Sequence, residues 1–336
     1  MPLLEARQLR VELHTYRGTA PAVRDMTFSL ERGDTLGLIG ESGCGKSMTA
    51  LALMGLAPDN ATVSGSLKLD GQELIGQRDR DWRTIRGARI AMIFQEPMTA
   101  LNPVHRIGHQ VMEPLRLHQR LPEREARARA LALLERVGIP DPARRFDSYP
   151  HQFSGGQRQR IMIAMALACA PDVLIADEPT TALDVTVQKQ ILALIAELVA
   201  ERGMALILIS HDLGLIAQNV RHMLVMYGGS VVERGLADTV FAHPAHPYTR
   251  GLLAARPSLA QRLVAHRSER LPTIPGTVPD LFSMPAGCPF AGRCAFTEDA
   301  CATAEPPEVH LGDAHSFRCR RPDVVLNAPE TVAGHA

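Results

Sequence analysis

The sequence predicts an α/β fold built on a mainly parallel β-sheet that helices cover, and two observations lead to this prediction. Short, continuously apolar runs alternate with segments of helical periodicity, a pattern typical of strands that are buried on both faces. A glycine-rich segment, residues 40–47, stands between one of these runs and a helical pattern, which predicts a strand–loop–helix unit. We predict strands at 35–39, 90–94, 173–177, 205–209 and 223–227.

Helices are predicted where apolar residues recur every three or four positions. One follows the glycine-rich segment at 48–54, a second spans 123–137, and a third covers 187–199. Gly228 and Gly229 predict a tight hairpin, which adds an antiparallel part to the sheet.

Composition excludes several classes of protein. Of 336 residues, 36 are Lys or Arg and 36 are Asp or Glu, so the formal net charge is zero and no basic field for nucleic acid is expected. No apolar run is long enough to span a bilayer, and the N-terminus lacks the pattern of a signal peptide. We therefore expect a soluble intracellular chain, in which six cysteines indicate thiols or a metal site rather than disulfides.

Residues 40–47 carry a definite chemistry, because they fit the phosphate-loop pattern G-x-x-x-x-G-K-[ST]. Glycines let backbone N–H groups form a nest around phosphate oxygens, and the following helix adds the positive end of its dipole. The lysine then reaches the β- and γ-phosphates, and the serine hydroxyl ligates Mg²⁺. The sequence thus predicts a nucleoside triphosphate site made by Gly40, Glu41, Ser42, Gly43, Cys44, Gly45, Lys46 and Ser47.

Five further motifs follow in order, each at a strand end or a helix start. Gln95 follows the strand at 90–94, and His211 follows the strand at 205–209. Asp177 and Glu178 are adjacent carboxylates after four apolar residues, a costly arrangement unless it serves a cation. The other two motifs are Phe153-Ser154-Gly155-Gly156-Gln157, before a helix, and Thr181-Ala-Leu-Asp184.

Together with the phosphate loop, these motifs resemble those of the ATP-binding-cassette (ABC) ATPases, over roughly residues 3–234. The resemblance implies an ATPase that needs ATP and Mg²⁺. It implies that Asp177 and Gln95 hold the metal together with Ser47, and that Glu178 accepts a proton from, or orients, the attacking water. His211 would donate to the γ-phosphate and stabilise charge in the transition state.

The resemblance also implies that two cassettes sandwich two ATP molecules. The helix start at Ser154, Gly155, Gly156 and Gln157 would cap the nucleotide of the opposing subunit, and Asp184 would lie at the dimer seam. The family stacks adenine on an aromatic residue upstream of the phosphate loop. Tyr16 is the candidate; the alternatives are that Leu13 occupies the usual position, or that Tyr16 is an unrelated aromatic on an edge strand.

Downstream motifs resemble one branch of this family, the dipeptide and oligopeptide importers. They are the segment 95–103, His246-Pro-Tyr-Thr249 with Leu252, Leu253 and Pro257, Ile274-Pro-Gly276, and Gly287-Cys-Pro-Phe-Ala-Gly-Arg-Cys294. Importers of nickel, glutathione and some oligosaccharides share the branch. We predict a nucleotide-binding domain at 1–240, with a helical subdomain at about 98–165, and a C-terminal extension at 241–336.

The extension holds four of the six cysteines, Cys288, Cys294, Cys301 and Cys319, in a module with little obvious core. Four thiolates suit tetrahedral zinc or an iron–sulfur cluster, and their spacing does not choose between them. The resemblance favours a 4Fe–4S cluster. Zinc and unligated thiols remain the alternatives.

The predicted function is therefore that of an ATP-hydrolysing subunit that energises a dipeptide or oligopeptide importer, peripheral on the cytoplasmic side of a bacterial inner membrane. Its expected partners are two permease subunits, a sister ABC ATPase and an extracytoplasmic solute-binding protein, with no nucleic acid. The segment 98–110, which follows Gln95, is the candidate permease-docking surface. The alternative from a different class is a soluble ABC ATPase acting on nucleic acid or the ribosome, which the neutral charge disfavours.

Overall fold

The computed structural model describes residues 1–336 except 97–99, 182, 256–272, 313 and 329–336. Within that part of the chain, a 12-stranded sheet runs in the order β5-β4-β1-β2-β10-β9-β3-β8-β7-β6, with β12 pairing β10 and β11. The strands are β1 (Leu4–Thr15), β2 (Gly18–Leu30), β3 (Thr35–Ile39), β4 (Ala61–Leu69), β5 (Gln72–Glu73), β6 (Ile90–Ile93), β7 (Val173–Asp177), β8 (Ala205–Ile209), β9 (His222–Tyr227), β10 (Ser230–Leu236), β11 (Glu308–His310) and β12 (Ser316–Arg318).

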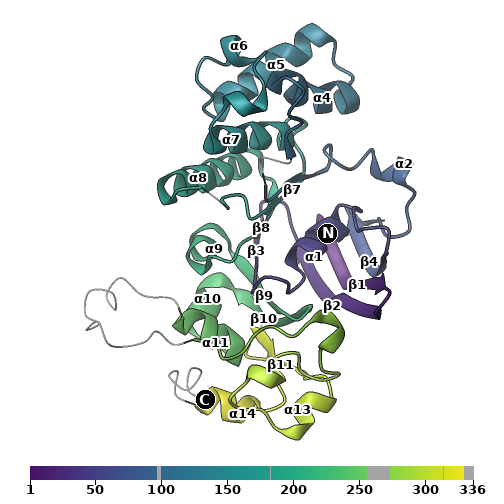
Figure 1. Ribbon diagram of the computed structural model, residues 1–336, viewed down its shortest axis with the longest axis vertical. Helices are drawn as coiled ribbons and strands as arrows, with labels where there is room; N and C mark the ends of the chain where they lie inside the picture. Colours follow the sequence, from purple (N-terminus) through teal and green to yellow (C-terminus); the bar gives the residue numbers. More distant parts are fainter. Residues whose placement is uncertain (97–99, 182, 256–272, 313, 329–336) are drawn as a thin grey trace, which may run out of the picture.

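The helices lie on both sides of the main sheet and in a separate layer beyond it (Figure 1). They are α1 (Lys46–Leu53), α2 (Asp79–Trp82), α4 (Ile107–Gln119), α5 (Glu123–Arg136), α6 (Pro142–Arg145), η1 (Pro150–Gln152), α7 (Gly155–Ala166), α8 (Val185–Arg202), α9 (Leu213–Asn219), α10 (Ala237–Ala242), α11 (Pro247–Ala254), η2 (Leu281–Ser283), η3 (Ala291–Arg293), α13 (Asp299–Thr303) and α14 (Pro322–Asn327).

The parallel core agrees with the sequence prediction. Strands β6, β7, β8, β3 and β9 pair in parallel in this order, and every residue of β6, β7 and β8 is buried. Continuous apolar runs are the sequence consequence of this burial, because helices cover both faces. Strand β6 ends at Ile93, one residue earlier than predicted, so Phe94 and Gln95 both lie beyond the strand.

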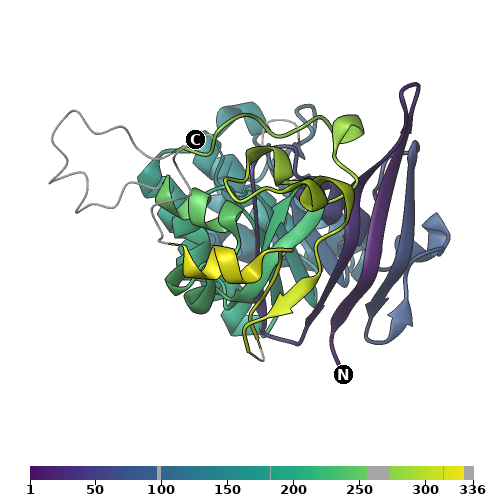
Figure 2. The same cartoon turned by 90° about the horizontal axis from the view of Figure 1, so that it is seen from below.

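A second, antiparallel layer is formed by β1, β2, β4 and β5, which Figure 2 shows as long strands beside the helix-covered sheet. The two layers meet where β2 pairs with β10 at Arg24 and Ser230. The predicted hairpin at Gly228 and Gly229 joins β9 to β10 as an antiparallel pair, with φ of 54° and 82° at the two glycines.

Helices α4 to α7 fill the interval predicted as a helical subdomain. Alanine and leucine side chains of α5, at Ala126, Ala130 and Leu134, are fully buried there and join the core cluster to which α7 also contributes. Residues 98 and 99, at the start of the predicted subdomain and docking surface, lie outside the described residues.

The segment after residue 240 packs directly on the cassette. Its strand β12 extends the main sheet by pairing Ser316 with Arg234 of β10. Beneath this pairing, the fully buried Glu233 carboxylate accepts hydrogen bonds from the backbone N–H groups of Ala245 and His246 and pairs with the His315 ring. The limits of the two domains remain a prediction.

The described helices include none whose length and apolarity would let it cross a membrane.

Candidate nucleotide-binding site

The predicted phosphate loop lies between β3 and α1, at the carboxyl edge of the parallel strands. Two of its glycines stand where a side chain has no room. A Cβ at Gly40 would lie 2.2 Å from the Met226 carbonyl oxygen, and one at Gly45 would lie 2.4 Å from the Ala22 carbonyl oxygen. Their φ angles of 154° and 102° also favour glycine. The backbone of β9 and β2 therefore fixes the turn of the loop.

Lys46 begins α1 and is only 6% exposed. Its Nζ donates hydrogen bonds to the carbonyl oxygens of Gly40, at 2.7 Å, and Glu41, at 3.1 Å. The ammonium group is thus held by the loop backbone at the positive end of the α1 dipole. This arrangement suits the binding of an anionic phosphate.

Asp177, the last residue of β7, faces the same loop and is 4% exposed. Its carboxylate is hydrogen-bonded to the Ser47 side chain. The other carboxylate oxygen, Oδ1, has no hydrogen-bond partner in the part of the chain that the structure describes. Burial raises the pKa of Asp177, and the nearby Glu178 carboxylate raises it further, against the influence of Ser47 and Lys46.

This donor set fits Mg²⁺. The ion prefers oxygen ligands, and a buried carboxylate oxygen that lacks a partner beside a serine hydroxyl supplies them. A divalent cation here would also favour the ionised form of Asp177 that burial opposes.

The Glu178 carboxylate contacts polar side chains that follow three neighbouring strands, β6, β7 and β8. Its Oε2 accepts hydrogen bonds from Gln95 Nε2, at 3.1 Å, and from Thr181 Oγ1, at 3.0 Å. His211 Nδ1 lies 3.2 Å from the same oxygen. Because β6, β7 and β8 are adjacent and parallel, Gln95, Glu178 and His211 meet at one edge of the sheet.

The backbone of Glu178 is strained, with a left-handed φ of 46°. Its N–H donates to the Ile209 carbonyl oxygen of β8, at 3.0 Å, which holds this conformation. The carboxylate is 15% exposed, so it is mostly shielded but open to a small reactant such as water.

A second group of predicted residues lies apart from the phosphate loop, where α7 and α8 begin side by side (Figure 1). Ser154 caps α7 through the Gln157 N–H, and the Gln157 side chain accepts from the Ser154 N–H, a complete capping box. A Cβ at Gly156 would lie 2.9 Å from Val187 of α8. Asp184 caps α8 by accepting from the N–H groups of Thr186 and Val187.

Ser154, Gly155 and Asp184 are exposed, so this second group forms an open surface. Tyr16, the adenine candidate, is 99% exposed in the turn between β1 and β2, and Leu13 is half-buried on β1. The neighbouring Arg17 stacks over Phe282 and pairs with Asp280 of the C-terminal segment, so that segment reaches the tip of the β1–β2 hairpin.

Three residues at the phosphate loop were missed by sequence reasoning: Arg293, Tyr227 and Tyr248. Arg293 forms a two-pronged ion pair with the Glu41 carboxylate, and the Tyr248 hydroxyl accepts from the Glu41 N–H at 2.8 Å. The motif His246-Pro-Tyr-Thr249 was the signal available for Tyr248, but for Arg293 no motif names a partner.

The four C-terminal cysteines line one small cavity of about 20 Å³, space for about one water molecule. Burial raises the pKa of Cys288 to about 12 and raises those of Cys294 and Cys319. In each case the N–H group two residues on, that of Phe290, Phe296 or Arg321, donates toward the sulfur. The described residues contain no group of three or more His, Cys, Asp or Glu side chains placed to hold a metal ion.

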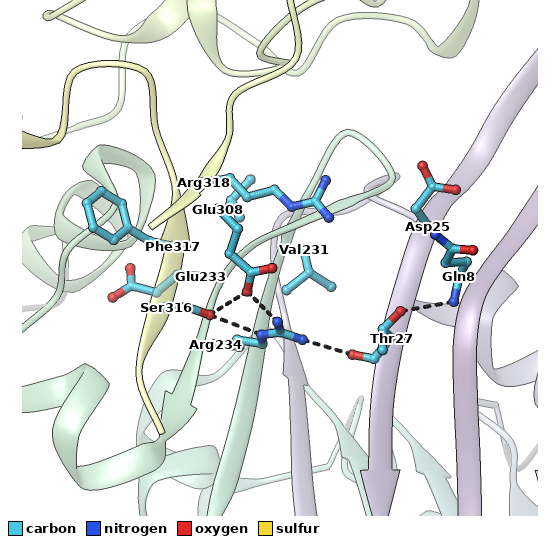
Figure 3. Close-up of a pocket in the computed structure, with 11 residues that line it drawn as sticks. Gln8, Asp25, Thr27, Val231, Glu233, Arg234, Glu308, Ser316, Phe317 and Arg318 are labelled. Atoms are coloured by element: carbon cyan, nitrogen blue, oxygen red, sulfur yellow. Dashed lines mark hydrogen bonds and ion pairs between the residues drawn. The ribbon is translucent and has the colours of Figure 1, made fainter. Parts of the chain in front are cut away.

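A separate hollow of about 260 Å³ marks the seam between β2, β10 and β12 (Figure 3). The Arg234 guanidinium donates there to the Ser316 hydroxyl, at 3.0 Å, and to the Thr27 carbonyl oxygen, at 3.3 Å, and it also pairs with Glu308. These polar groups satisfy one another, so the contacts join the C-terminal segment to the cassette.

Comparison with known proteins identifies the family. The chain is 48% identical over 319 residues to the dipeptide transport ATP-binding protein of Bacillus subtilis, covering 94% of each chain. It is 49% identical over 306 residues to the oligopeptide transport ATP-binding protein of Salmonella typhimurium, covering 91% of this chain and 90% of the relative. The chain belongs to the ABC transporter ATPase family. It is therefore an ABC-type ATPase.

Two family profiles match this ABC ATPase, one described as ABC transporter at residues 23–181 and one as oligopeptide/dipeptide transporter, C-terminal region, at residues 232–301. A dimeric structure of the ATP-binding cassette MJ0796 bound to ADP and Pi is 26% identical, with a TM-score of 0.63, and covers 70% of this chain and 98% of its own. CbiO1 of Clostridium perfringens gives 29% identity and a TM-score of 0.60 over 72% of this chain and 91% of its own. The predicted cassette fold is confirmed.

Proposed function

We propose that this ABC ATPase energises the import of dipeptides or oligopeptides, and that it works at the cytoplasmic face of a bacterial inner membrane. The observation that carries the proposal is that two features occur in one chain. One is the phosphate-loop site with Gln95 and His211 in contact with Glu178, and the other is the oligopeptide/dipeptide C-terminal region. Relatives named for dipeptide and oligopeptide transport support the cargo. Nickel, glutathione and oligosaccharides remain the alternative cargoes.

Each residue of the site has a role in the proposed reaction. Bound Mg²⁺, held by Ser47 and Asp177 with Gln95 nearby, would neutralise phosphate charge. Lys46 and the loop residues from Gly40 to Ser47 bind the triphosphate. Glu178 orients the attacking water and accepts its proton, because its Oε2 is a partly exposed acceptor fixed by three neighbours.

His211 lies beside Glu178 with a 67% exposed side chain, so it can turn toward the γ-phosphate and stabilise the charge that develops there.

The second group of predicted residues completes the site of a partner cassette. Ser154, Gly155, Gly156 and Gln157 form a helix N-terminus that points backbone N–H groups outward, and the adjoining α8 exposes Asp184 and the apolar Val185. The dimeric cassette with ADP and Pi supports a sandwich of this kind. Tyr16 or Leu13 would contact adenine. A sister ATPase, two permease subunits and a solute-binding protein complete the proposed importer.

The cysteine cavity is proposed to hold a 4Fe–4S cluster, with zinc as the alternative. Four thiols converge on one cavity, and three of them face N–H groups of the kind that stabilise metal-bound sulfur. A cluster needs the loops to open beyond the present 20 Å³, whereas zinc needs less room. Anaerobic purification should give brown protein with iron and sulfide. Colourless protein with one zinc per chain would reverse the order.

The test of the proposed function uses Glu178→Gln in the complex with its permease partners. Loss of a general base lowers turnover by about 10²- to 10⁴-fold, while ATP binding is retained. Glu135→Gln, an exposed carboxylate on α5, is the control and should hydrolyse ATP and drive uptake like the wild type. Undiminished hydrolysis by Glu178→Gln would contradict its role. Uptake of nickel but not of peptides by the wild-type complex would contradict the cargo.

A further inference from the structure

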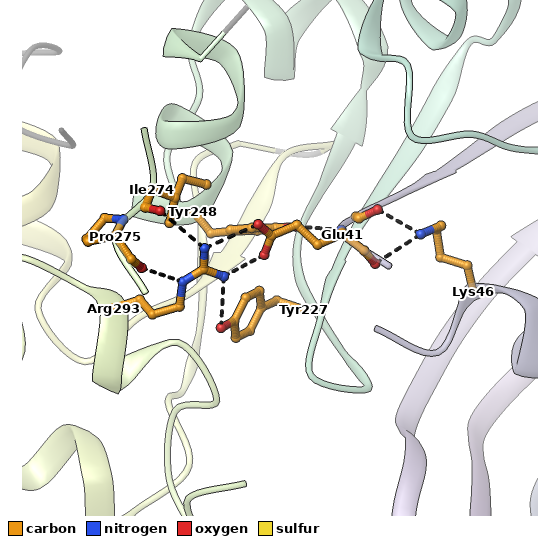
Figure 4. Close-up of polar contacts among 8 residues, drawn as sticks. Glu41, Lys46, Tyr227, Tyr248, Ile274, Pro275 and Arg293 are labelled. Atoms are coloured by element: carbon orange, nitrogen blue, oxygen red, sulfur yellow. Dashed lines mark hydrogen bonds and ion pairs between the residues drawn. The ribbon is translucent and has the colours of Figure 1, made fainter. Parts of the chain in front are cut away.

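The C-terminal segment reaches into the phosphate loop at Glu41, the second residue of the loop (Figure 4). Arg293 Nη1 lies 2.5 Å from Glu41 Oε2, and Arg293 Nη2 lies 3.2 Å from Glu41 Oε1. This is a two-pronged pair between planar groups, the stronger geometry for arginine and carboxylate. The Arg293 side chain is only 6% exposed and that of Glu41 is 30% exposed, so the pair is partly shielded from water.

Arg293 is itself firmly held. Its Nε donates to the Pro275 carbonyl oxygen at 2.7 Å, its Nη2 also to the Ile274 carbonyl oxygen at 3.4 Å, and its Nη1 also to the Tyr227 hydroxyl at 3.3 Å. With three nitrogens engaged and the side chain buried, the guanidinium has little freedom to follow Glu41 elsewhere. The Glu41 side chain is 30% exposed and so is the less enclosed member of the pair.

The backbone of Glu41 is held from the same side. The buried Tyr248 hydroxyl accepts from its N–H at 2.8 Å, and Lys46 Nζ donates to its carbonyl oxygen at 3.1 Å. Arg293 and Tyr248 thus orient the same residue whose carbonyl positions the phosphate-binding lysine. Arg293 also neutralises a carboxylate that would otherwise stand bare in a loop that binds a polyanion.

Arg293 belongs to the segment between two of the clustered cysteines. It ends η3 and directly precedes Cys294, while Phe290, two residues after Cys288, packs edge-on against Tyr227 with ring centres 5.1 Å apart. The Cys288 N–H donates to the Cys301 carbonyl oxygen at 2.7 Å, which ties this segment to α13. The segment that carries Arg293 is therefore in direct contact with the cysteine cluster.

We propose that Arg293 is a positioning residue for the phosphate loop, through which the cysteine cluster sets the affinity for Mg-ATP. The inference rests on the proposed nucleotide site. Its physical basis is the chain of contacts from the segment 288–294 through Arg293 to Glu41 and Lys46. The C-terminal extension then regulates the ATP site as well as stabilising the fold.

The first test measures equilibrium binding of Mg-ATP to the full chain. Arg293→Met leaves the Glu41 carboxylate unpaired and should weaken binding about tenfold, which corresponds to about 1.4 kcal/mol. Adding Glu41→Gln removes that bare charge, so the double variant should bind to within about threefold of the wild type. Arg293→Lys keeps the positive charge but loses the two-pronged geometry. Its affinity for Mg-ATP should lie between those of Arg293→Met and the double variant.

The control is Arg250→Met. Arg250 is another arginine of the C-terminal segment, and its side chain donates hydrogen bonds to the carbonyl oxygens of Pro244 and Val325. The substitution should lower the melting temperature but leave Mg-ATP affinity unchanged. Arg293→Met that binds Mg-ATP like the wild type would overturn the inference, and so would a double variant as weak as the single one. A wild-type chain that does not bind Mg-ATP would instead refute the proposed function. If Arg293→Met does not fold, Arg293→Lys and the double variant decide.

The second test concerns the cysteine cluster. Cys301→Ser removes one thiol of the cavity from outside the segment 288–294, and it keeps the backbone carbonyl that accepts from the Cys288 N–H. It should weaken Mg-ATP binding in the wild-type background and add nothing to Arg293→Met, because both act through one link. If Cys301→Ser leaves the Mg-ATP affinity unchanged, or if its effect simply adds to that of Arg293→Met, the cysteine cluster does not act on the nucleotide site through Arg293.

Discussion

His246 should make the C-terminal segment sensitive to mild acid. The imidazole is 2% exposed, and burial lowers its pKa from 6.5 to about 4, although the Glu233 carboxylate opposes the shift. Its Nδ1 accepts a hydrogen bond from the Tyr248 N–H at 3.1 Å and so caps α11. A proton on Nδ1 would break this cap, so the folded state requires the neutral ring.

The sign and size follow from linkage. The folded pKa is depressed, so the stabilisation is complete above the unfolded value of 6.5 and is lost as the pH falls toward about 4. At about pH 5, a group with these two pKa values costs the folded state about 2 kcal/mol relative to neutral pH. The loss should concentrate in α11 and its neighbours.

The measurement compares the wild type with His246→Asn. Asparagine can still cap α11 through its side-chain oxygen, but it does not titrate. Hydrogen–deuterium exchange of the α11 amides, corrected for intrinsic rates, gives the local opening free energy. Between about pH 7.5 and 5, the wild type should lose about 2 kcal/mol more than the variant. Equal losses in the two proteins would refute the assignment of a buried neutral imidazole.

Three further predictions concern the cassette. Asp177→Asn should raise the stability of the nucleotide-free chain by about 1 kcal/mol, since a neutral amide costs less to bury than a carboxylate. The same variant should lose the stabilisation that Mg-ATP gives, and thermal unfolding with and without Mg-ATP measures both effects. Asp184→Ala should lower the free energy of unfolding by about 1 kcal/mol through loss of the α8 cap, whereas Asp184→Asn should keep the cap and the stability. Undiminished turnover in Asp184→Asn would show that the Asp184 charge has no part in the reaction. Gly156→Ala should lower turnover by up to about a hundredfold, because the new Cβ meets Val187, and Val187→Ala should restore it in the double variant; failure of that rescue would exclude the steric explanation.

Much of the parallel core was predictable because its signals are local. Strand β7 and strand β8 occur at the predicted residues, since a strand buried on both faces must be written as a continuous apolar run. Helix α8 is followed by Gly203, whose left-handed φ of 61° is typical of a glycine that caps a helix C-terminus. Helix α1 begins at Lys46, two residues earlier than the predicted 48, because the phosphate loop turns directly into the helix at Gly45.

The meeting of Gln95, Glu178 and His211 follows from sequence order plus one topological fact, that their strands are parallel neighbours. The motifs alone do not predict that Gln95, Thr181 and His211 all contact the same oxygen, Oε2 of Glu178. The strained φ of Glu178 was also beyond sequence reasoning, because the N–H bond to Ile209 that holds it comes from the neighbouring strand.

The contacts of the C-terminal segment were not predictable for a different reason. Arg293 and Glu41 are 252 positions apart, and each is an ordinary charged residue in its local sequence. Their pairing depends on how η3 is placed by the packing of Phe290 against Tyr227 and by the docking of β12 on β10. Such placement is the outcome of tertiary packing, to which no periodicity or spacing corresponds.

This division between local and distant signals has a functional consequence. The groups proposed to bind and cleave ATP lie in the short motifs that carry the resemblance to the family, whereas the contact that we propose to tune the phosphate loop comes from the extension. A substitution at Arg293 should therefore change nucleotide affinity while leaving the contacts of Glu178 intact. Turnover at saturating Mg-ATP should then fall much less than affinity does, a split that distinguishes positioning of the loop from damage to the reaction itself.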